Sequence, residues 1–438
     1  MTAASPPRRF LWVTWEGGGT TPPELAIVRR LGARGHAVRV LGDACLEADA
    51  RAVGAELSAF RRAPQRRTRT RESEITADWA ARTPLGAFER ARDRHAFAPA
   101  GLFARDVLEV LKEWPADRVV VDAMLFGGLV GAEASGLPFA AVIPMTSFLP
   151  APGRPPSGLG LWPARGAIGA ARDRVLTAIG DRFLWRSCLP LLNRARASAG
   201  LGAVEHPLDQ IRAAGRVLVL TDPHFDFDAA PDAGGVVYTG PELDDPVWAA
   251  PATAPLRWAE EEGEPESRPL VVVGLSSSYQ AQEGLLRRVI EALGRLPVRG
   301  LVTLGPALAA EALGGAGGIP GNVLVRTSVR HSEVLGEAAL VVTHGGHGTV
   351  IRTLAAGVPM LVLPMGRDQA DNAARVAWLG AGRRLSAGSS VGQIAGAITA
   401  ALGDGTLREG ARAAAEGMRR RWEGRDVAVS ELEGLAAR

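Results

Sequence analysis

One turn in the second half of the chain carries two histidines among glycines. The stretch THGGHGT, residues 343–349, directly follows the apolar run Ala338–Val342. A helix is expected to begin near Gly348–Thr349 and to stop at Gly357, with Pro359 beyond it. Glycines let backbone N–H groups approach a ligand closely, and a helix N-terminus favours an anion. The stretch therefore predicts a phosphate-binding turn, with a tight glycine turn and an incidental histidine as the alternative.

Two further loops follow apolar runs in the same half of the chain. PMGRDQADN, residues 364–372, places Asp368 beside Gln369. A carboxylate and an amide together suit vicinal sugar hydroxyls, although Asp368 could instead cap the next helix. GLSSS, residues 274–278, offers hydroxyl and N–H groups that could face a phosphate or cap a helix. Ligands of open α/β sheets bind at the carboxyl ends of strands, where all three loops are expected.

The loop WEGGGTTPPEL, residues 15–25, follows the first apolar run of the chain. Gly17 and Gly19 lie between a predicted strand and a predicted helix, and Asp43 ends the second predicted strand. This spacing partly matches the dinucleotide fingerprint of NAD(P)-dependent oxidoreductases. The position of the third glycine is Pro22, so the fingerprint is incomplete and favours that class only weakly.

Three polar residues near this loop could act on a substrate hydroxyl. Residues 21–24, Thr-Pro-Pro-Glu, predict a capping box with proline at the first helical position, which leaves Thr20 to bond a ligand or the backbone. Asp122 ends the apolar run VVVD and could serve as a general base if burial raised its pKa, or could cap the next turn. Glu16 is a second candidate base.

Short apolar runs alternate with segments of helical length along most of the chain, which predicts parallel sheets with crossover helices. The expected strands of the first half are Phe10–Trp15, Ala37–Leu41, Val119–Asp122, Phe139–Ile143 and Val217–Leu220. Those of the second half are Leu270–Gly274, Gly300–Leu304, Asn322–Val325, Ala339–Val342 and Met360–Leu363.

A proline-rich stretch with an acidic block at Glu260–Glu262 separates the two halves. We therefore predict an α/β protein with two domains, each with its own sheet. The expected parts are a first domain at 1–240, a linker at 241–269, a second domain at 270–420 and a C-terminal helix at 421–438 that could cross back to the first domain.

The composition excludes several classes of protein. The chain has 438 residues, 47% hydrophobic and 22% charged, with a net charge of +3 and no concentrated basic face, so nucleic-acid binding is not expected. Lys112 is the only lysine, which excludes a Walker A loop and disfavours a Schiff base. Cys45 and Cys188 are too few for a disulfide framework or a cysteine-built zinc site. With neither a signal peptide nor an apolar run of ~20 residues, we expect a cytoplasmic protein without a membrane span.

Two charged stretches have plain interpretations. In Thr221–Asp228, TDPHFDFD, acidic residues and His224 alternate, but an extended chain spaces them too widely to share one ion, so we predict a solvated loop and no metal site. Arg61–Arg71, RRAPQRRTRTR, is interpreted as a solvated, mobile loop rather than an anion site.

The stretch 343–381, THGGHGTVIRTLAAGVPMLVLPMGRDQADNAARVAWLGA, resembles the donor-site signature of the family 1 nucleotide-sugar glycosyltransferases, most of all their bacterial natural-product branch. The linker opening TGPELDD, residues 239–245, agrees with it. The resemblance implies a GT-B fold of two Rossmann-like domains. It also implies inverting transfer from a TDP- or UDP-sugar to a small, largely apolar natural product, as in antibiotic biosynthesis. The nucleotide sugar is a co-substrate, and no cofactor or metal is implied; the chain would be a monomer or homodimer.

The same resemblance assigns donor-site roles. The diphosphate would be held by the turn residues, helped by either of two serines: His344, Gly345, Gly346, Gly348, Thr349, Ser276 and Ser277. Asp368 and Gln369 would bind the sugar. Ser328 and Val329, in the loop Arg326–His331, would lie near the base. Many relatives carry a Trp and a Pro-Gln pair in that loop, and this chain has neither.

The resemblance places an acceptor pocket in the first half. Its expected residues are Trp15, Gly18, Gly19, Phe126, Phe148 and Trp162, beneath a mobile loop at 144–165, with core packing as the alternative for any single aromatic. Relatives commonly carry a His or Asp general base where this chain has Thr20, and threonine cannot serve as a base at neutral pH. The base would then be Asp122 or Glu16. Alternatively the acceptor is acidic, such as a phenol, or the chain is a non-catalytic nucleotide-sugar binder or partner protein.

Overall fold

The computed structural model describes residues 6–228, 235–249, 268–309 and 318–436, with the single residues 251, 256, 258 and 313. Much of the predicted linker, including the acidic block 260–262, lies outside the described residues. The chain divides into two compact units. Unit 1 comprises Met1–Pro156, Pro163–Glu242 and Gly424–Arg438, and unit 2 comprises Ser157–Trp162 and Leu243–Glu423.

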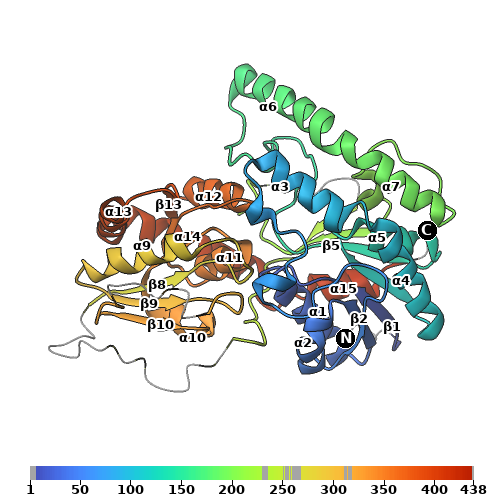
Figure 1. Cartoon of the computed structure of the whole chain (residues 1–438), viewed down its shortest axis with the longest axis horizontal. Helices are drawn as coiled ribbons and strands as arrows, with labels where there is room; N and C mark the ends of the chain where they lie inside the picture. The colour runs from blue at the N-terminus through green and yellow to red at the C-terminus, as the bar shows by residue number, and fades with distance from the viewer. Residues whose placement is uncertain are drawn as a thin grey trace. The chain divides into compact units, whose positions relative to one another are not determined.

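Unit 1 contains a seven-stranded parallel sheet in the order β3-β2-β1-β4-β5-β6-β7. Several of its strands are labelled in Figure 1. Its strands are β1 (Arg9–Val13), β2 (Ala37–Gly42), β3 (Glu56–Ala59), β4 (Arg118–Asp122), β5 (Phe139–Ile143), β6 (Arg216–Val219) and β7 (Val236–Tyr238). The five predicted strands are confirmed, each within two residues at either end. β3 and β7 were not predicted, because ELSA of β3 is polar and half-exposed and the apolar run VVY of β7 has only three residues.

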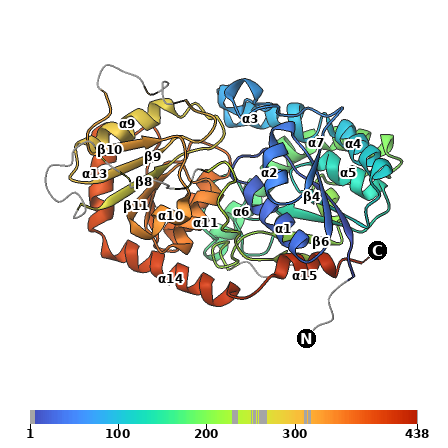
Figure 2. The same ribbon diagram turned by 90° about the horizontal axis from the view of Figure 1, so that it is seen from below.

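Unit 1 also contains helices. They are α1 (Thr21–Ala33), α2 (Glu47–Ala52), α3 (Pro84–Ala91), α4 (Ala100–Glu113), α5 (Phe126–Ala134), α6 (Gly166–Gly180), α7 (Arg186–Ser198), α8 (Asp209–Arg212) and α15 (Val427–Glu433), with π-helical turns at Arg92–Ala96 and Asp181–Trp185. The C-terminal α15 lies beside α1 (Figure 2). Its Val429 and Leu432 share one hydrophobic cluster with Phe10 and Trp12 of β1.

Unit 2 contains a six-stranded parallel sheet in the order β10-β9-β8-β11-β12-β13. Its strands are β8 (Leu270–Gly274), β9 (Arg299–Thr303), β10 (Val323–Arg326), β11 (Ala338–Thr343), β12 (Met360–Val362) and β13 (Gly382–Arg384). Its helices are α9 (Glu283–Gly294), α10 (His331–Val334), α11 (His347–Ala355), α12 (Gln369–Trp378), α13 (Val391–Gly403) and α14 (Gly405–Trp422). The predicted strands are again confirmed, and β13, with its two exposed arginines, was not predicted.

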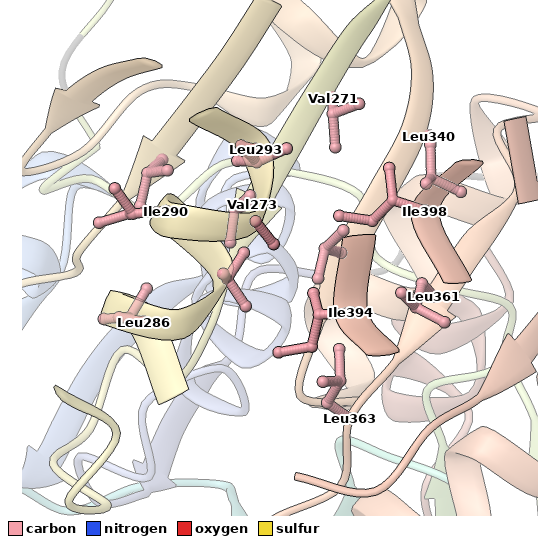
Figure 3. Packing of buried hydrophobic residues seen from close by; sticks show 14 of the residues in the cluster. Val271, Val273, Leu286, Ile290, Leu293, Leu340, Leu361, Leu363, Ile394 and Ile398 are labelled. Atoms are coloured by element: carbon pink, nitrogen blue, oxygen red, sulfur yellow. The ribbon is translucent and has the colours of Figure 1, made fainter. Parts of the chain in front are cut away.

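The core of unit 2 lies between its sheet and two helices (Figure 3). Leu286 and Ile290 of α9 and Ile394 of α13 belong to one buried cluster with Val271 and Val273 of β8. Burying side chains of this size contributes about 1.5–3 kcal/mol each. This packing fixes β8 and its neighbour β11, and therefore the loops that leave their carboxyl ends.

The strand order reverses at the centre of each sheet. In unit 1 the reversal lies between β1 and β4, and in unit 2 between β8 and β11. Loops leave in opposite directions at such a point, so a crevice forms at the carboxyl ends of the two strands, where ligands of α/β folds bind. In unit 1, Trp15 follows β1 and Asp122 is the last residue of β4. In unit 2, Ser276 follows β8 and His344 follows β11. No described helix is both long and apolar enough to cross a membrane.

The close packing of α5 on α4 supplies a test of the fold of unit 1. A Cβ at Gly127 would lie 2.2 Å from the carbonyl oxygen of Ala100. We expect Gly127→Ala to lower the free energy of unfolding by about 1–3 kcal/mol, because the helices must move apart. Urea denaturation followed by tryptophan fluorescence measures it.

Gly32→Ala is the matched control. No described heavy atom lies within 4 Å of a Cβ at Gly32 in α1, so this change should be neutral or stabilise by up to about 1 kcal/mol. Equal effects of the two substitutions would contradict the packing.

Candidate active site

The turn after β11 is shaped by its glycines. α11 begins at His347, close to the predicted start, and Gly357 follows its end with φ +70°. Gly345 has φ +95°, and a Cβ there would lie 2.8 Å from the side chain of Val362. A Cβ at Gly346 would lie 2.6 Å from Nε2 of His344. Both positions therefore require glycine, one for its backbone angle and one because the imidazole packs against it.

His344 is buried at the end of β11, beside β8. It forms a hydrogen bond with the backbone of Gly274, the last residue of β8. Burial, with a smaller contribution from the nearby positive charge of Arg367, lowers its pKa to about 4. The imidazole is therefore neutral at neutral pH and carries one N–H donor. The first turn of α11 adds backbone N–H groups that have no partner within the helix.

Asp368 and Gln369 open α12, but they face different surroundings. Asp368 does not cap the helix with its side chain, so the capping alternative is wrong. Its Oδ2 accepts a hydrogen bond from Nδ2 of Asn372 at 2.8 Å, and burial raises its pKa. Gln369 is buried, and its Oε1 accepts from the N–H groups of Met365 and Gly366 at 2.7 and 3.1 Å. Gln369 thus holds the loop before α12, and its contact with a sugar stays a prediction.

The serines after β8 belong to the same network. Ser276 is buried, and its hydroxyl accepts from Nε2 of Gln280 at 2.8 Å and lies 3.2 Å from Oγ of Ser278. Oε1 of Gln280 in turn accepts from Nε2 of Gln369 at 2.8 Å. A Cβ at Gly305 would lie 3.0 Å from Cα of Ser277, which is half-buried. The three predicted loops of unit 2 therefore meet.

The sequence did not single out two residues that join these loops. Gln280 links the serine loop to Gln369. Asn372 donates from Nδ2 to the carbonyl oxygen of Gly345 at 2.8 Å as well as to Asp368. The four-residue spacing from Asp368 to Asn372 within a predicted helix could have identified Asn372. Nothing in the sequence identified Gln280.

The loop after β10 is anchored within unit 2. Asp245 accepts from the backbone N–H of His331 at 3.0 Å and of Ser332 at 3.3 Å. Ser328 donates from Oγ to the carbonyl oxygen of Trp248 at 3.4 Å, and Val329 is buried. The predicted contact of Ser328 and Val329 with a nucleotide base stays a prediction.

Trp15 and Asp122 are joined at the reversal point of unit 1. Nε1 of Trp15 donates to Oδ2 of Asp122 at 3.0 Å, and the N–H of Met124 donates to Oδ1 at 2.7 Å. Asp122 is only 1% exposed, and burial raises its pKa to about 6. The structure shows the raised pKa of one alternative and the bond to the next turn of the other. Both oxygens of Asp122 are engaged, by a ring N–H and by the next turn.

Glu24 is a buried partner of Asp122. Its carboxyl accepts from Nε1 of Trp12 at 2.8 Å and from Oγ1 of Thr14 at 3.0 Å, and it is hydrogen-bonded to Asp122. Burial and the neighbouring Asp122 raise the pKa of Glu24 well above its usual range. Two carboxyl groups bond to each other only through a proton, so Glu24 carries it and Asp122 accepts.

The predicted capping box at 21–24 is wrong, because Glu24 points into the unit rather than back to the helix start. No side-chain cap bond forms at the start of α1. Thr21 instead donates from Oγ1 to the carbonyl oxygen of Trp15 at 3.0 Å and accepts from the N–H of Gly17 at 3.3 Å. Thr21 therefore closes the loop between β1 and α1.

Glu16 is an ion-pair partner in this structure. Its Oε2 accepts from Nε of Arg69 at 2.7 Å, and its Oε1 accepts from the N–H of Gly18 at 2.9 Å. Arg69 also contacts Asp49 at 2.8 Å. These bonds leave Glu16 poorly suited to take a proton from a substrate.

The interpretation of 61–71 as a solvated, mobile loop is wrong at two of its arginines. Arg66 is buried and pairs with Glu74 at 3.0 Å. Arg69 is held by Glu16 and Asp49. Acidic residues elsewhere in the chain pull these side chains inward, which the charge run alone does not reveal.

Thr20 lies between the glycines and α1. Its Oγ1 is buried and has no hydrogen-bond partner among the residues that the structure describes. A Cβ at Gly17 would lie 2.2 Å from this atom, so Gly17 makes room for it. Gly18 has φ +77°, and Gly19 is exposed with no described atom within 4 Å of a Cβ.

The dinucleotide-binding alternative requires an acidic residue that can reach a ribose. Asp43 is buried, and its Oδ2 accepts from the N–H of Glu16 at 2.8 Å. Burial raises its pKa to about 6. A ribose-binding carboxylate has to reach two hydroxyls of the ligand, and Asp43 instead braces the loop after β1.

The predicted acceptor aromatics have different positions. Phe126 is fully buried and packs on Phe97 with ring centroids 4.2 Å apart, which supports its core-packing alternative. Phe148 is half-buried in unit 1. Trp162 is 46% exposed and belongs to unit 2.

The segment Ser157–Trp162 of unit 2 is anchored on α12. The N–H groups of Gly158 and Gly160 donate to Asp371 at 2.5 and 2.6 Å. A Cβ at Gly160 would lie 2.8 Å from the carbonyl oxygen of Ala370. This part of the predicted mobile loop 144–165 is therefore held by specific bonds within unit 2.

In Thr221–Asp228 the acidic residues do not converge. Asp226 is fully buried, accepts from Oη of Tyr238 at 2.6 Å and pairs with Arg154 at 2.9 Å. His224 bonds Asp228 at 2.7 Å at the surface. Asp226 is therefore a structural residue rather than part of a solvated loop.

Comparison with known proteins agrees with the fold. Residues 288–433 match the family described as the erythromycin biosynthesis protein CIII-like C-terminal domain. The chain is 29% identical to 4'-demethylrebeccamycin synthase of Lentzea aerocolonigenes, over 86% of this chain and 89% of that protein.

Solved structures show the same fold. The glycosyltransferase of kitacinnamycin superposes with a TM-score of 0.74 at 21% identity, covering 98% of this chain and 99% of that one. The glycosyltransferase VinC in complex with dTDP gives 0.63 at 18% identity, covering 98% and 99%. The chain is thus a glycosyltransferase of the GT-B fold, with two Rossmann-like domains. Its relatives act in the biosynthesis of antibiotics and other natural products.

The buried carboxyl pair of unit 1 should limit stability at higher pH. Folding raises the pKa of Glu24 above its usual value of 4.5. The free-energy cost of burying the pair is therefore small below pH 4.5 and grows as the pH rises above 4.5. We expect the free energy of unfolding of Glu24→Gln, relative to the wild type, to rise between pH 5 and pH 8, because the amide has no proton to lose when the chain unfolds.

Urea unfolding at the two pH values measures this effect. Glu89→Gln, at an exposed position of α3, is the matched control and should show no pH-dependent gain. A relative stability of Glu24→Gln that does not rise between pH 5 and pH 8 would contradict the shared-proton arrangement.

Proposed function

We propose that the protein is an inverting glycosyltransferase that moves a sugar from a TDP- or UDP-sugar to a small, largely apolar natural product. The observation that carries this proposal is the packing of His344 against Gly346 at the start of α11, at the reversal point of the unit 2 sheet. The relative named a demethylrebeccamycin synthase and the fold neighbour solved with dTDP support the acceptor class and the donor class.

The diphosphate of the donor would lie at the N-terminus of α11. There the helix dipole and the N–H groups of its first turn, which have no acceptor within the helix, stabilise negative charge. Burial keeps His344 neutral, and an adjacent diphosphate would raise its pKa and favour the imidazolium. The leaving group is stabilised as charge develops on its oxygen, so we propose no obligatory metal.

Asp368 is the residue best placed to bind the sugar. Its carboxyl lies at the start of α12 and is fixed by Asn372, which also holds the carbonyl of Gly345. The surrounding loops are joined by hydrogen bonds among Gln369, Gln280 and Ser276. The sugar would then be attacked at its anomeric carbon from the face opposite the diphosphate, in one displacement.

On the acceptor side, Asp122 positions Trp15 rather than meeting the substrate. Its two oxygens are filled by Trp15 and Met124, and Glu24 shares its proton with it. The acceptor would then contact the exposed part of Trp15 and the glycine loop at 17–19.

Nucleotide binding is the direct test. The ligands to compare are TDP, UDP, GDP and NAD. A ligand present at about 100 times its dissociation constant should stabilise the protein by about 2.7 kcal/mol. We expect a thermal shift with TDP or UDP, no shift with NAD, and loss of the shift in His344→Ala. A shift with NAD alone would favour an oxidoreductase, and no shift with any nucleotide would contradict the proposal.

Stereochemistry tests the displacement. With TDP-α-glucose or UDP-α-glucose and 4-methylumbelliferone as probes, proton NMR should show a β-linked product. An α-linked product would rule out the single displacement. Nucleotide binding without transfer to any of a panel of phenols would favour a non-catalytic role.

A further inference from the structure

One buried histidine of unit 1 has no role in the site described above. His95 lies in the π-helical turn Arg92–Ala96, between α3 and α4. Such turns insert one residue into a helix and often mark functional positions. The histidine is only 4% exposed.

The surroundings of His95 are apolar on two sides. Its ring lies 4.3 Å from the ring centroid of Trp15, tilted by 42°, and 5.6 Å from that of Phe103, edge to face. Nε2 is buried and has no hydrogen-bond partner in the described part of the chain. Buried polar atoms are nearly always bonded, so an unpartnered one needs an explanation.

A second unpartnered atom adjoins the same indole. The position of a Cβ at Gly17 lies 2.2 Å from Oγ1 of Thr20 and 3.2 Å from Cζ2 of Trp15, so the hydroxyl and the indole edge are neighbours. Oγ1 of Thr20 is buried and, within the described residues, unbonded as well. Asp122 fixes the orientation of this indole through Nε1. Two buried polar atoms thus stand beside one fixed aromatic ring at the carboxyl end of β1.

We propose that Nε2 of His95 is the general base toward the acceptor, and that Thr20 hydrogen-bonds the same acceptor oxygen. This inference rests on the proposed glycosyl transfer. The acceptor O–H bond breaks as its proton moves to Nε2, and the oxygen forms a bond to the anomeric carbon. The bond from that carbon to the diphosphate oxygen breaks, and its electron pair leaves with the nucleoside diphosphate.

The two bases that the sequence suggested, Asp122 and Glu16, are already engaged. Both oxygens of Asp122 and of Glu16 accept hydrogen bonds, and Glu24 carries the proton that it shares with Asp122. His95 is free to accept because burial lowers its pKa to about 4, which keeps the ring neutral at neutral pH. A neutral imidazole has one acceptor nitrogen, as this role requires.

Acceptors of graded acidity test the proposal. We would compare wild type, His95→Asn and the surface control His224→Asn with phenol, 4-methylumbelliferone and 4-nitrophenol, using TDP-glucose and UDP-glucose as donors. Removing a general base costs typically 10²–10⁴-fold. We expect kcat of His95→Asn to fall about 10²-fold or more with phenol and less than about 10-fold with 4-nitrophenol, which ionises without help. His224→Asn should match the wild type.

Two results would overturn the role of His95: an unchanged kcat in His95→Asn, or an equal loss with all three phenols. In either case the wild type still transfers sugar, so the proposed function stands. If the wild type neither binds a nucleotide nor transfers to any phenol, the proposed function fails with it. The nucleotide-induced thermal shift of His95→Asn should equal that of the wild type, which separates the acceptor side from the donor side.

A measurement on the wild type guards against a variant that does not fold. In ¹⁵N-histidine NMR spectra, the Nε2 resonance of His95 should move when 4-methylumbelliferone is added to the TDP complex, because a hydrogen bond forms at that atom. An unchanged resonance at saturating 4-methylumbelliferone would contradict the contact.

Discussion

The hydrogen bond from Trp15 to Asp122 is the interaction on which the acceptor side of this protein depends. It joins the loop after β1 to the end of β4, the two strands at which the unit 1 sheet reverses its order. Asp122 accepts this bond well because it shares a proton with Glu24, which in turn bonds Trp12 and Thr14. The cost of burying two carboxyl groups is offset by aligned donors, and the result is an indole of fixed orientation. Thr20 lies near the edge of that indole, and His95 packs against it.

Unit 2 holds its strand-end loops in a different way. Its three strand-end loops are tied by amides, with Gln280 and Gln369 on one side and Asn372 on the other. Amides supply donors and acceptors together and carry no charge to desolvate, so they suit loops that lie beside the proposed diphosphate site. The glycines of the turn 343–349 let backbone N–H groups and His344 lie close to that proposed site.

The sequence predicted the parts of this arrangement that depend on local pattern. Buried parallel strands are apolar runs, so β5 and β8 were predicted to the residue, while β3 and β13 carry polar, exposed side chains and were not. The turn 343–349 was predicted because glycine and histidine at a strand end have few structural uses. Contacts between side chains far apart in the sequence could not be predicted. Thr21 and Glu24 have the spacing of a capping box, yet Glu24 is drawn to Asp122. His95 carries no motif, and only its contact with Trp15 sets it apart.

The position of α15 has a consequence for protein engineering. The last helix supplies Val429 and Leu432 to the same cluster as Phe10 and Trp12, so unit 1 is built from both ends of the chain. Topologically, most of unit 2 is an insertion between Glu242 and Gly424. A chimera made by joining the first half of this chain to the second half of another at one crossover would give unit 1 a foreign α15. Exchange of the second unit should therefore use two crossovers, so that the native closing helix is kept.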